Sequence, residues 1–152
     1  MVVLVSGDDY KDPRIELFIK IAAIEMIRKH GAILFYTRNC GQFQTHAAQI
    51  LNSISANTML YTPFIPCEHP DKPCYNNPAY HCLNEKNLPG YAPHRKDIFM
   101  LEACDSLITN ISDPQSDSAK LASIALKKGL TVINVLKYDQ MLSKPKKCEF
   151  FL

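Results

Sequence analysis

Polar residues suited to anion binding follow three of the predicted strands. They lie in Gly7–Asp12, Arg38–Gln44 and Asp113–Ser118, and His94 and Arg95 open another predicted helix. We expect helices to begin at Thr45, Arg95 and Ser116, where free N–H groups and the positive end of the helix dipole favour an anion. Together with Arg38 and Arg95, these helix starts predict a site for a phosphate or another anion. The alternative is that Thr45 and Ser116 are ordinary helix caps and that both arginines are solvated.

Thiols and imidazoles are concentrated in one proline-rich stretch. They are Cys67, His69, Cys74, His81 and Cys82. Both groups are good zinc ligands, and a metal would order a stretch that cannot form a core of its own. Their spacing does not match a Cys-x-x-Cys knuckle, so the alternative to a zinc site is a set of unliganded loop residues.

Several familiar catalytic motifs are absent from the sequence. It contains no paired carboxylate motif, no Gly-x-Ser-x-Gly elbow and no Walker lysine, and no Gly-x-Gly-x-x-Gly follows the first predicted strand. These motifs position nucleophiles and phosphates in the common hydrolases and nucleotide-dependent enzymes. Their absence disfavours a dinucleotide-dependent oxidoreductase and a nucleoside triphosphatase.

The stretch 95–135 organises the elements that must position these residues. It reads as a helix, a short apolar strand at 106–110, a polar loop, a second helix and an apolar strand at 131–135. Two strands joined by a helix pair in parallel through a right-handed crossover. Predicted strands at 2–6, 32–36 and 58–62 precede this stretch in alternation with helices. The pattern predicts a Rossmann-like, doubly wound α/β fold with a five-stranded, mainly parallel sheet of order 3-2-1-4-5.

The segment 63–93 interrupts this alternation. It holds seven of the ten prolines and three of the six cysteines, without helical or strand periodicity. Irregular runs of this length within a compact domain are usually lids, binding loops or disordered excursions. We therefore expect one domain over residues 1–152, with 63–93 as an inserted lid or as an interface loop in a homo-oligomer.

Charge and hydropathy exclude some partners. The formal net charge is only +2, and acidic and basic residues are interspersed, so a nucleic-acid partner is not expected. The first apolar run is too short for a signal peptide or a membrane span. These features predict a soluble cytoplasmic protein with reduced cysteines.

Three sequence segments carry a family resemblance. They are Val3–Asp12, Arg95–Ile108 and 113–132. The first resembles the opening strand and loop of the SLOG superfamily of Rossmann-like domains, especially its small stand-alone branch related to YspA and YpsA. The second is similar to the Arg-Asn-x-x-Met helix and following Ala-Asp strand of that branch, and the third to its Gly-Thr loop, helix and strand.

This resemblance implies a ligand and a site. SLOG domains bind or process nucleotide-derived small molecules, so the expected function is to bind such a molecule at the carboxyl edge of the sheet, as a sensor, a carrier or a sequestering protein. The residues that match the family's ligand loops are Gly7, Asp8, Asn39, Gly41, Arg95, Ser116 and Ser118.

Two alternatives come from relatives within the superfamily. The LOG phosphoribohydrolases imply cleavage or transfer at a nucleotide N-glycosidic bond, with Asp8, Asp113 or Asp117 as the candidate catalytic carboxylate. The glutamate of the LOG motif has no counterpart here, and the second loop has fewer glycines than the family pattern, so this alternative ranks second. The DNA-binding DprA proteins imply a nucleic-acid or protein-interaction module, against which the near-neutral charge argues.

Overall fold

The computed structural model describes residues 1–61 and 93–143 of the chain. The elements in chain order are β1 (Val2–Val5), α1 (Arg14–His30), β2 (Leu34–Arg38), α2 (Gln42–Ser53), β3 (Thr58–Tyr61), α3 (Pro93–Leu101), β4 (Ser106–Thr109), α4 (Asp117–Lys127), β5 (Thr131–Asn134) and α5 (Lys137–Ser143). The five strands form one sheet in the order β3-β2-β1-β4-β5, and all of its pairs are parallel. The predicted α/β fold and strand order are confirmed.

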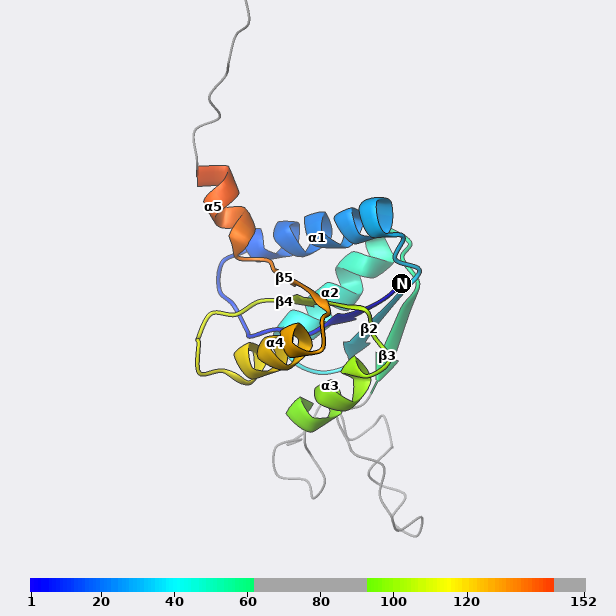
Figure 1. Cartoon of the computed structure of the whole chain (residues 1–152). Helices are drawn as coiled ribbons and strands as arrows, with labels where there is room; N and C mark the ends of the chain where they lie inside the picture. The colour runs from blue at the N-terminus through cyan, green and yellow to red at the C-terminus, as the bar shows by residue number, and fades with distance from the viewer. Residues whose placement is uncertain (62–92, 144–152) are drawn as a thin grey trace, which may run out of the picture.

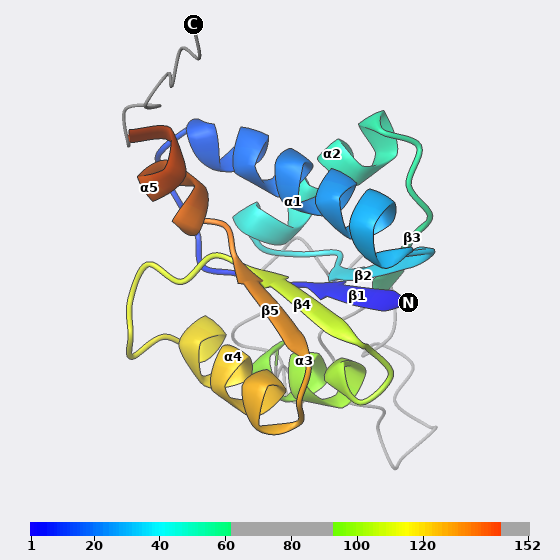
Figure 2. The same ribbon diagram turned by 45° about the horizontal axis from the view of Figure 1, so that its top comes forward.

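Helices cover both faces of the sheet. Figures 1 and 2 show α1, α2 and α5 on one face and α3 and α4 on the other. Successive strand residues point to opposite faces. Accordingly, Val3 and Val5 of β1 join the core under α1 and α2, whereas Leu4 joins the core under α3 and α4. The continuous apolar run of β1 is therefore explained by burial on both sides.

The switch point lies between β1 and β4. β1 pairs with β2 on one side and with β4 on the other. The chain leaves β1 toward α1 on one face of the sheet and leaves β4 toward α4 on the opposite face. The β1–α1 loop and the β4–α4 loop consequently separate at the carboxyl edge, at the left of Figure 2. Open α/β sheets bind their ligands in the crevice formed at such a point.

The second strand lies two residues later than the sequence pattern predicts. Helix α1 ends at Gly31, which has a left-handed conformation, and the N–H groups of Gly31 and Ala32 both donate to the Met26 carbonyl. These bonds keep Ala32 at the helix end, so β2 begins at Leu34. The prediction that Arg38 opens the following loop is thus wrong, because Arg38 is the last residue of β2.

Helix α2 begins earlier than predicted. Its N-cap is Gly41 at φ 89°, with no side-chain cap, so Thr45 lies inside the helix and is not its cap. The earlier start buries Phe43 completely, in line with Ala47 and Leu51 on the same helix face. Few side chains tolerate the backbone conformation of Gly41, which makes glycine suitable at this helix start.

Several predictions concern residues outside the described part of the chain. The predicted insertion, apart from Pro93 at the start of α3, and the proposed zinc ligands Cys67, His69, Cys74, His81 and Cys82 lie there. Within residues 1–61 and 93–143, no group of three or more His, Cys, Asp and Glu side chains is placed to hold a metal ion. In the same residues, no helix has both the length and the apolar character needed to cross a membrane.

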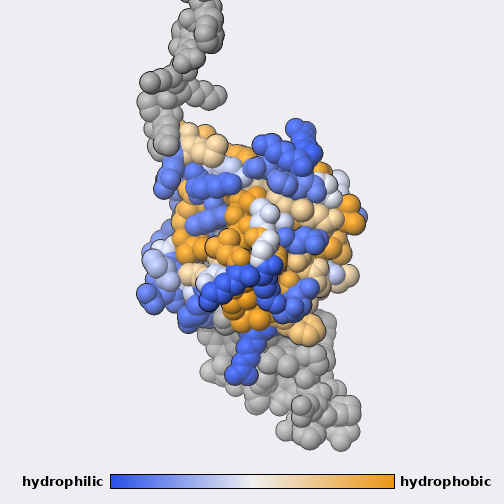
Figure 3. Space-filling model, in the orientation of Figure 1, coloured by the Kyte–Doolittle hydropathy of each residue, from blue (hydrophilic) through white to orange (hydrophobic). Residues whose placement is uncertain are grey.

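Figure 3 shows apolar residues interspersed with hydrophilic ones over the face seen in Figure 1.

Candidate functional site

A cleft of about 590 Å³ lies at the switch point, where the β1–α1 loop, the start of α2 and the segment after β4 meet. We call it the switch-point cleft. Its polar lining consists of Asp9, Tyr10, Lys11, Asp12, Gln42, Asn110 and Ser112. Small-molecule sites usually enclose about 300–1,000 Å³, so the cleft has room for a ligand of nucleoside or nucleotide size.

The cleft also has apolar walls. Ile15 from the first turn of α1 and Leu136 from the segment after β5 line it. Ile15 is only 2% exposed, and Leu136 packs against the core beneath α1 and α2. Apolar walls with a few polar groups are typical of sites that bind a planar ring and fix its orientation by hydrogen bonds.

Tyr10 is held firmly beside the cleft. Its N–H donates to Gln42 Oε1 at 2.7 Å, and its hydroxyl lies 2.5 Å from His46 Nδ1. Its ring packs edge-on against Phe43, with ring centroids 6.3 Å apart. Burial, with added repulsion from Glu16, raises the pKa of Tyr10 to about 12. The phenol is therefore neutral at physiological pH and contributes a fixed aromatic surface with a polar end.

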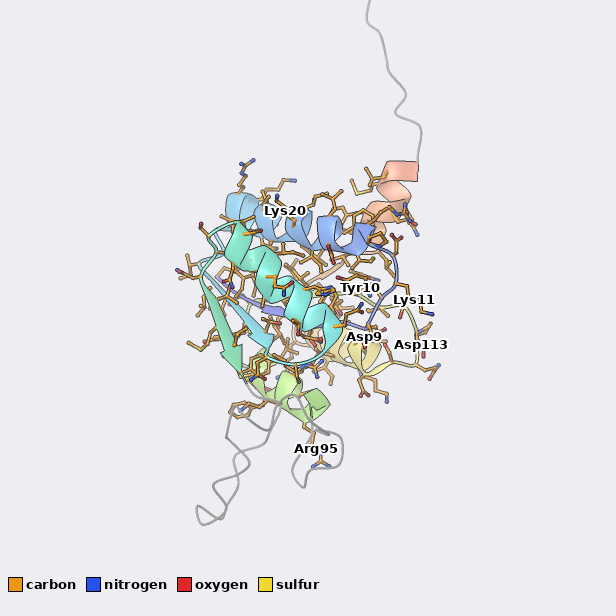
Figure 4. All side chains as sticks on the ribbon, turned by 180° about the vertical axis from the view of Figure 1, so that it is seen from behind. Asp9, Tyr10, Lys11, Lys20, Arg95 and Asp113 are labelled. Carbon is orange, nitrogen blue, oxygen red and sulfur yellow. The ribbon has the colours of Figure 1, made fainter. Side chains whose placement is uncertain are left out.

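Two charged side chains in the cleft are free to meet a ligand. Asp9 and Lys11 are exposed, and neither makes a hydrogen bond or ion pair to any described residue. Figure 4 shows them on the same side of the molecule as Asp113. Asp12, by contrast, accepts from the Arg14 N–H at 2.9 Å and caps the start of α1.

Asn110 lies at the base of the cleft. It is 1% exposed, and its Nδ2 donates to the Asp8 carbonyl at 2.9 Å. Its Oδ1 has no hydrogen-bond partner among the described residues. Buried polar atoms are usually paired, so an unpaired acceptor beside a cleft is a feature that a ligand donor would satisfy.

The side chain of Asp8, one of the predicted catalytic and binding residues, hydrogen-bonds to the β4–α4 loop. Its Oδ2 accepts from the Ser112 N–H at 3.0 Å and from the Ser112 hydroxyl at 3.2 Å. Burial raises the pKa of Asp8, but hydrogen bonds from Ser118, the Ser112 N–H, Ser116 and the Asp113 N–H outweigh it, so the pKa is lowered. A carboxylate stabilised in this way is a weak base, and its Oδ2 is already bonded to Ser112.

Ser116 and Ser118 therefore have a structural role in the described residues. Ser116 caps α4, as its residue type predicts, because its Oγ accepts from the Ala119 N–H at 3.2 Å. Ser118 is 8% exposed, and both hydroxyls lie near enough to the Asp8 carboxylate to help lower its pKa. Their contact with a ligand stays a prediction.

The other two catalytic candidates have local partners. Asp113 Oδ1 accepts from the Gln115 N–H at 2.8 Å in a turn, and Asp117 lies 3.4 Å from Lys120 on the surface of α4. Asp113 is exposed near the cleft, whereas Asp117 belongs to the first turn of the helix. Of the acidic residues in these loops, Asp9 is the cleft-lining carboxylate without a partner in the described part of the chain.

The predicted glycine and asparagine positions have clear packing roles. A Cβ atom on Gly7 would lie 2.5 Å from the Asn110 backbone nitrogen, so glycine permits β1 to continue closely past β4. Asn39 donates its N–H to the Tyr61 carbonyl at 3.0 Å, while its buried Oδ1 has no partner among the described residues. Gly41 starts α2. Any contact of these residues with a ligand stays a prediction.

Arg38 belongs to a buried cluster that the sequence did not reveal, here called the Asp97 network. Asp97, 4% exposed on α3, accepts from the Ser6 hydroxyl and the Tyr61 hydroxyl at 2.6 Å each. Arg38 Nε lies 3.3 Å from Asp97 Oδ1, close enough for an ion pair although not aligned as a hydrogen bond. Gln44 Nε2 donates to Ser6 Oγ at 3.3 Å. The network joins the carboxyl ends of β1, β2 and β3 to α3.

Arg95 is not brought to the cleft. It is exposed on α3 and has no hydrogen bond or ion pair with the described residues. In Figure 4 it lies well apart from Asp9, Lys11 and Asp113. The structure thus brings Gly7 and Asp8 together with Ser116 and Ser118 beside the cleft, places Arg38 in the Asp97 network, and leaves Arg95 separate.

The comparisons with known proteins identify no family. No protein-family model and no curated protein matches the chain. Two solved structures are similar in fold: the universal stress protein from Archaeoglobus fulgidus, 14% identical with a TM-score of 0.48, and the same protein in complex with dAMP, 15% identical with a TM-score of 0.46. The first alignment covers 88% of this chain and 93% of that protein, and the second covers 88% and 97%. At this level of similarity, neither ligand nor activity is transferred to this chain.

Proposed function

We propose that the chain binds a nucleotide-derived small molecule in the switch-point cleft and acts as a sensor, a carrier or a sequestering protein. The observation that carries the proposal is the cleft itself, which combines a suitable volume with apolar walls and unpaired polar groups at the switch point. The ligand class rests on the sequence resemblance to SLOG domains, whose family membership is part of this proposal.

The lining explains how such a ligand would be held. A base would lie against Ile15, Leu136 and the Tyr10 side chain, and an N–H group on it would meet Asn110. Asp9 and Lys11 would interact with hydroxyl or other polar groups at the open side. Most of these contacts come from short loops fixed to the sheet, so the site is largely formed before binding.

A thermal-shift screen of nucleosides, nucleotides, cyclic nucleotides and ADP-ribose derivatives tests the proposal. A ligand at a hundred times its Kd stabilises the folded state by about 2.7 kcal/mol, which gives a clear shift. No shift with any compound, in a sample shown to be folded, would contradict the proposal.

Two matched variants locate the site. Lys11→Trp places a large ring in the cleft and should abolish the shift, because Lys11 lines the cleft and has no structural partner among the described residues. Lys20→Trp is the control, since Lys20 is exposed on α1 and lies away from the cleft in Figure 4. Equal effects of the two substitutions would place the ligand elsewhere.

A second candidate function is cleavage or transfer at the N-glycosidic bond of the ligand. It is favoured by Asp9, a cleft-lining carboxylate that no described residue occupies. Such a carboxylate can stabilise a developing oxocarbenium ion or activate water. Release of free base from a nucleoside or nucleotide panel, lost in Asp9→Asn and retained in Asp117→Asn, would establish this activity. Binding without any release of base would leave the protein a binder.

A further inference from the structure

The start of α4 is the place beside the cleft where a phosphate would ordinarily be bound, because helix N–H groups there favour an anion. In this chain an internal anion, the Asp8 carboxylate, already binds the loop that leads into that helix. Asp8 Oδ2 accepts from the N–H of Ser112 at 3.0 Å and from its hydroxyl at 3.2 Å. A phosphate could use these donors only by displacing Asp8.

The charges around the cleft also disfavour a phosphate. Asp9 and Asp12 line it, and Asp8 lies beside it. Arg14, the nearest arginine along the chain, is held by Asp12 at 2.7 Å and by Asp139 at 2.8 Å. Among the described residues that line the cleft, this leaves Lys11 as the unpaired cation. Like charges repel, so a phosphate dianion would enter a region with more negative than positive charge.

Asn110, which lines the cleft, carries a hydrogen-bond acceptor that is unpaired among the described residues. Asn110 is 1% exposed, and its Oδ1 has no partner in the described part of the chain. An amino, imino or hydroxyl group of an uncharged ligand can donate to this oxygen. An ionised phosphate has only acceptor oxygens and cannot. The same atom therefore favours the base or sugar end of a nucleotide over its phosphate end.

We infer that the switch-point cleft selects nucleosides, or similar uncharged and donor-rich ring compounds, over phosphorylated nucleotides. Two features support this: the Asp8 carboxylate already occupies the N–H and hydroxyl of Ser112, and acidic side chains predominate around the cleft, while the Asn110 acceptor suits a donor on the base or sugar. The inference rests on the proposed function, since it names the ligand class of the same site. Asp8 acts as a built-in substitute for a phosphate.

The decisive experiment compares a nucleoside with its own 5′-monophosphate and triphosphate by isothermal titration calorimetry at low salt. We expect the nucleoside to bind at least about tenfold more tightly than the monophosphate, a difference of about 1.4 kcal/mol. Affinity that rises with each added phosphate would overturn the inference and leave the proposed function standing. If no nucleoside or nucleotide binds to the folded protein, both are overturned.

The salt dependence provides a second readout that needs no variant. Repulsion between the acidic cleft and a phosphate is screened by salt, so the monophosphate should bind more tightly as the salt concentration rises, while the nucleoside changes little. Monophosphate binding that weakens with salt would show attraction and contradict the inference.

A substitution tests the role of Asp8 directly. Asp8→Ala frees the N–H and hydroxyl of Ser112 and should improve monophosphate affinity relative to nucleoside affinity by about tenfold, equivalent to about 1.4 kcal/mol. Lys20→Ala, an exposed position on α1, serves as the control and should leave this ratio unchanged. An unchanged ratio in folded Asp8→Ala would refute the role of Asp8, and the wild-type comparison decides the inference if this variant does not fold.

Discussion

Removal of Asp97 should destabilise the chain strongly, because it leaves a buried positive charge without compensation. In Asp97→Leu the hydroxyls of Ser6 and Tyr61 lose an acceptor at 2.6 Å, and Arg38, whose side chain is 14% exposed, loses its counter-ion. Breaking a buried ion pair from one side typically costs about 3–5 kcal/mol. Urea unfolding with linear extrapolation measures the loss. For a chain of this size it corresponds to a decrease in Tm of about 2–4 °C per kcal/mol.

The double variant Arg38→Met/Asp97→Leu separates the charge effect from simple loss of packing. With neither charge present it should be more stable than Asp97→Leu alone by about 3 kcal/mol or more, because replacing both partners of a buried pair with apolar side chains is often neutral or stabilising. The surface pair of Asp117 and Lys120 gives the control, since its side chains are 65% and 62% exposed and Asp117→Leu should cost less than about 1 kcal/mol. The reasoning is refuted if Asp97→Leu costs no more than Asp117→Leu, or if the double variant is as unstable as the single one.

Three further substitutions test the switch-point region by urea unfolding. Asp8→Asn should cost about 1–2 kcal/mol at pH 7, against less than about 0.5 kcal/mol for the unpaired Asp9→Asn. Folding lowers the pKa of Asp8, so the difference in stability between the Asp8→Asn and Asp9→Asn variants is fully present above the unfolded pKa of about 3.9. It should disappear as the pH falls through the folded pKa, and a difference that stays constant with pH would contradict the hydrogen bonding assigned to Asp8. Gly7→Ala should cost about 1–3 kcal/mol, since its Cβ would lie 2.5 Å from a backbone nitrogen, and no loss would show that β1 and β4 separate easily. Ser116→Ala should cost about 1 kcal/mol through loss of the α4 cap, whereas Ser123→Ala, exposed within α4, should be neutral or slightly stabilising; equal effects would exclude the cap.

The fold could be predicted from the sequence because each signal is local. Apolar runs such as Val2–Val5 and Ser106–Thr109, alternating with amphipathic helices, leave a parallel sheet as the architecture that buries them. Element ends were less predictable. For α2, Thr45 has the side chain of a typical helix cap and therefore predicts too late a start. The spacing of Phe43, Ala47 and Leu51 on one helix face indicates the observed start.

The topology places the predicted loops at one edge of the sheet, and the binding of a ligand there stays a prediction. The loops after β1 and β4 do meet at the switch point, as topology requires. Within those loops, however, sequence alone cannot show which side chains turn inward. Asp8 was expected to face a ligand and instead bonds to Ser112, while its neighbour Asp9 is free among the described residues. Asp97 was missed for the same reason, since its partners are distant in sequence and meet it only in the folded chain.

The Asp97 network also determines how the fold accommodates residues 62–92. Tyr61, the last residue of β3, donates to Asp97 in the first half of α3 at 2.6 Å, so the two flanks of this stretch are bonded directly to each other. The chain therefore leaves β3 and enters α3 at points that lie close together. The entropy cost of joining two such points grows only with the logarithm of the number of residues between them, by about 0.6 kcal/mol for each doubling. Evolution could therefore lengthen, shorten or replace this stretch with little thermodynamic consequence for the five strands, provided that the tyrosine and aspartate at its junction are retained.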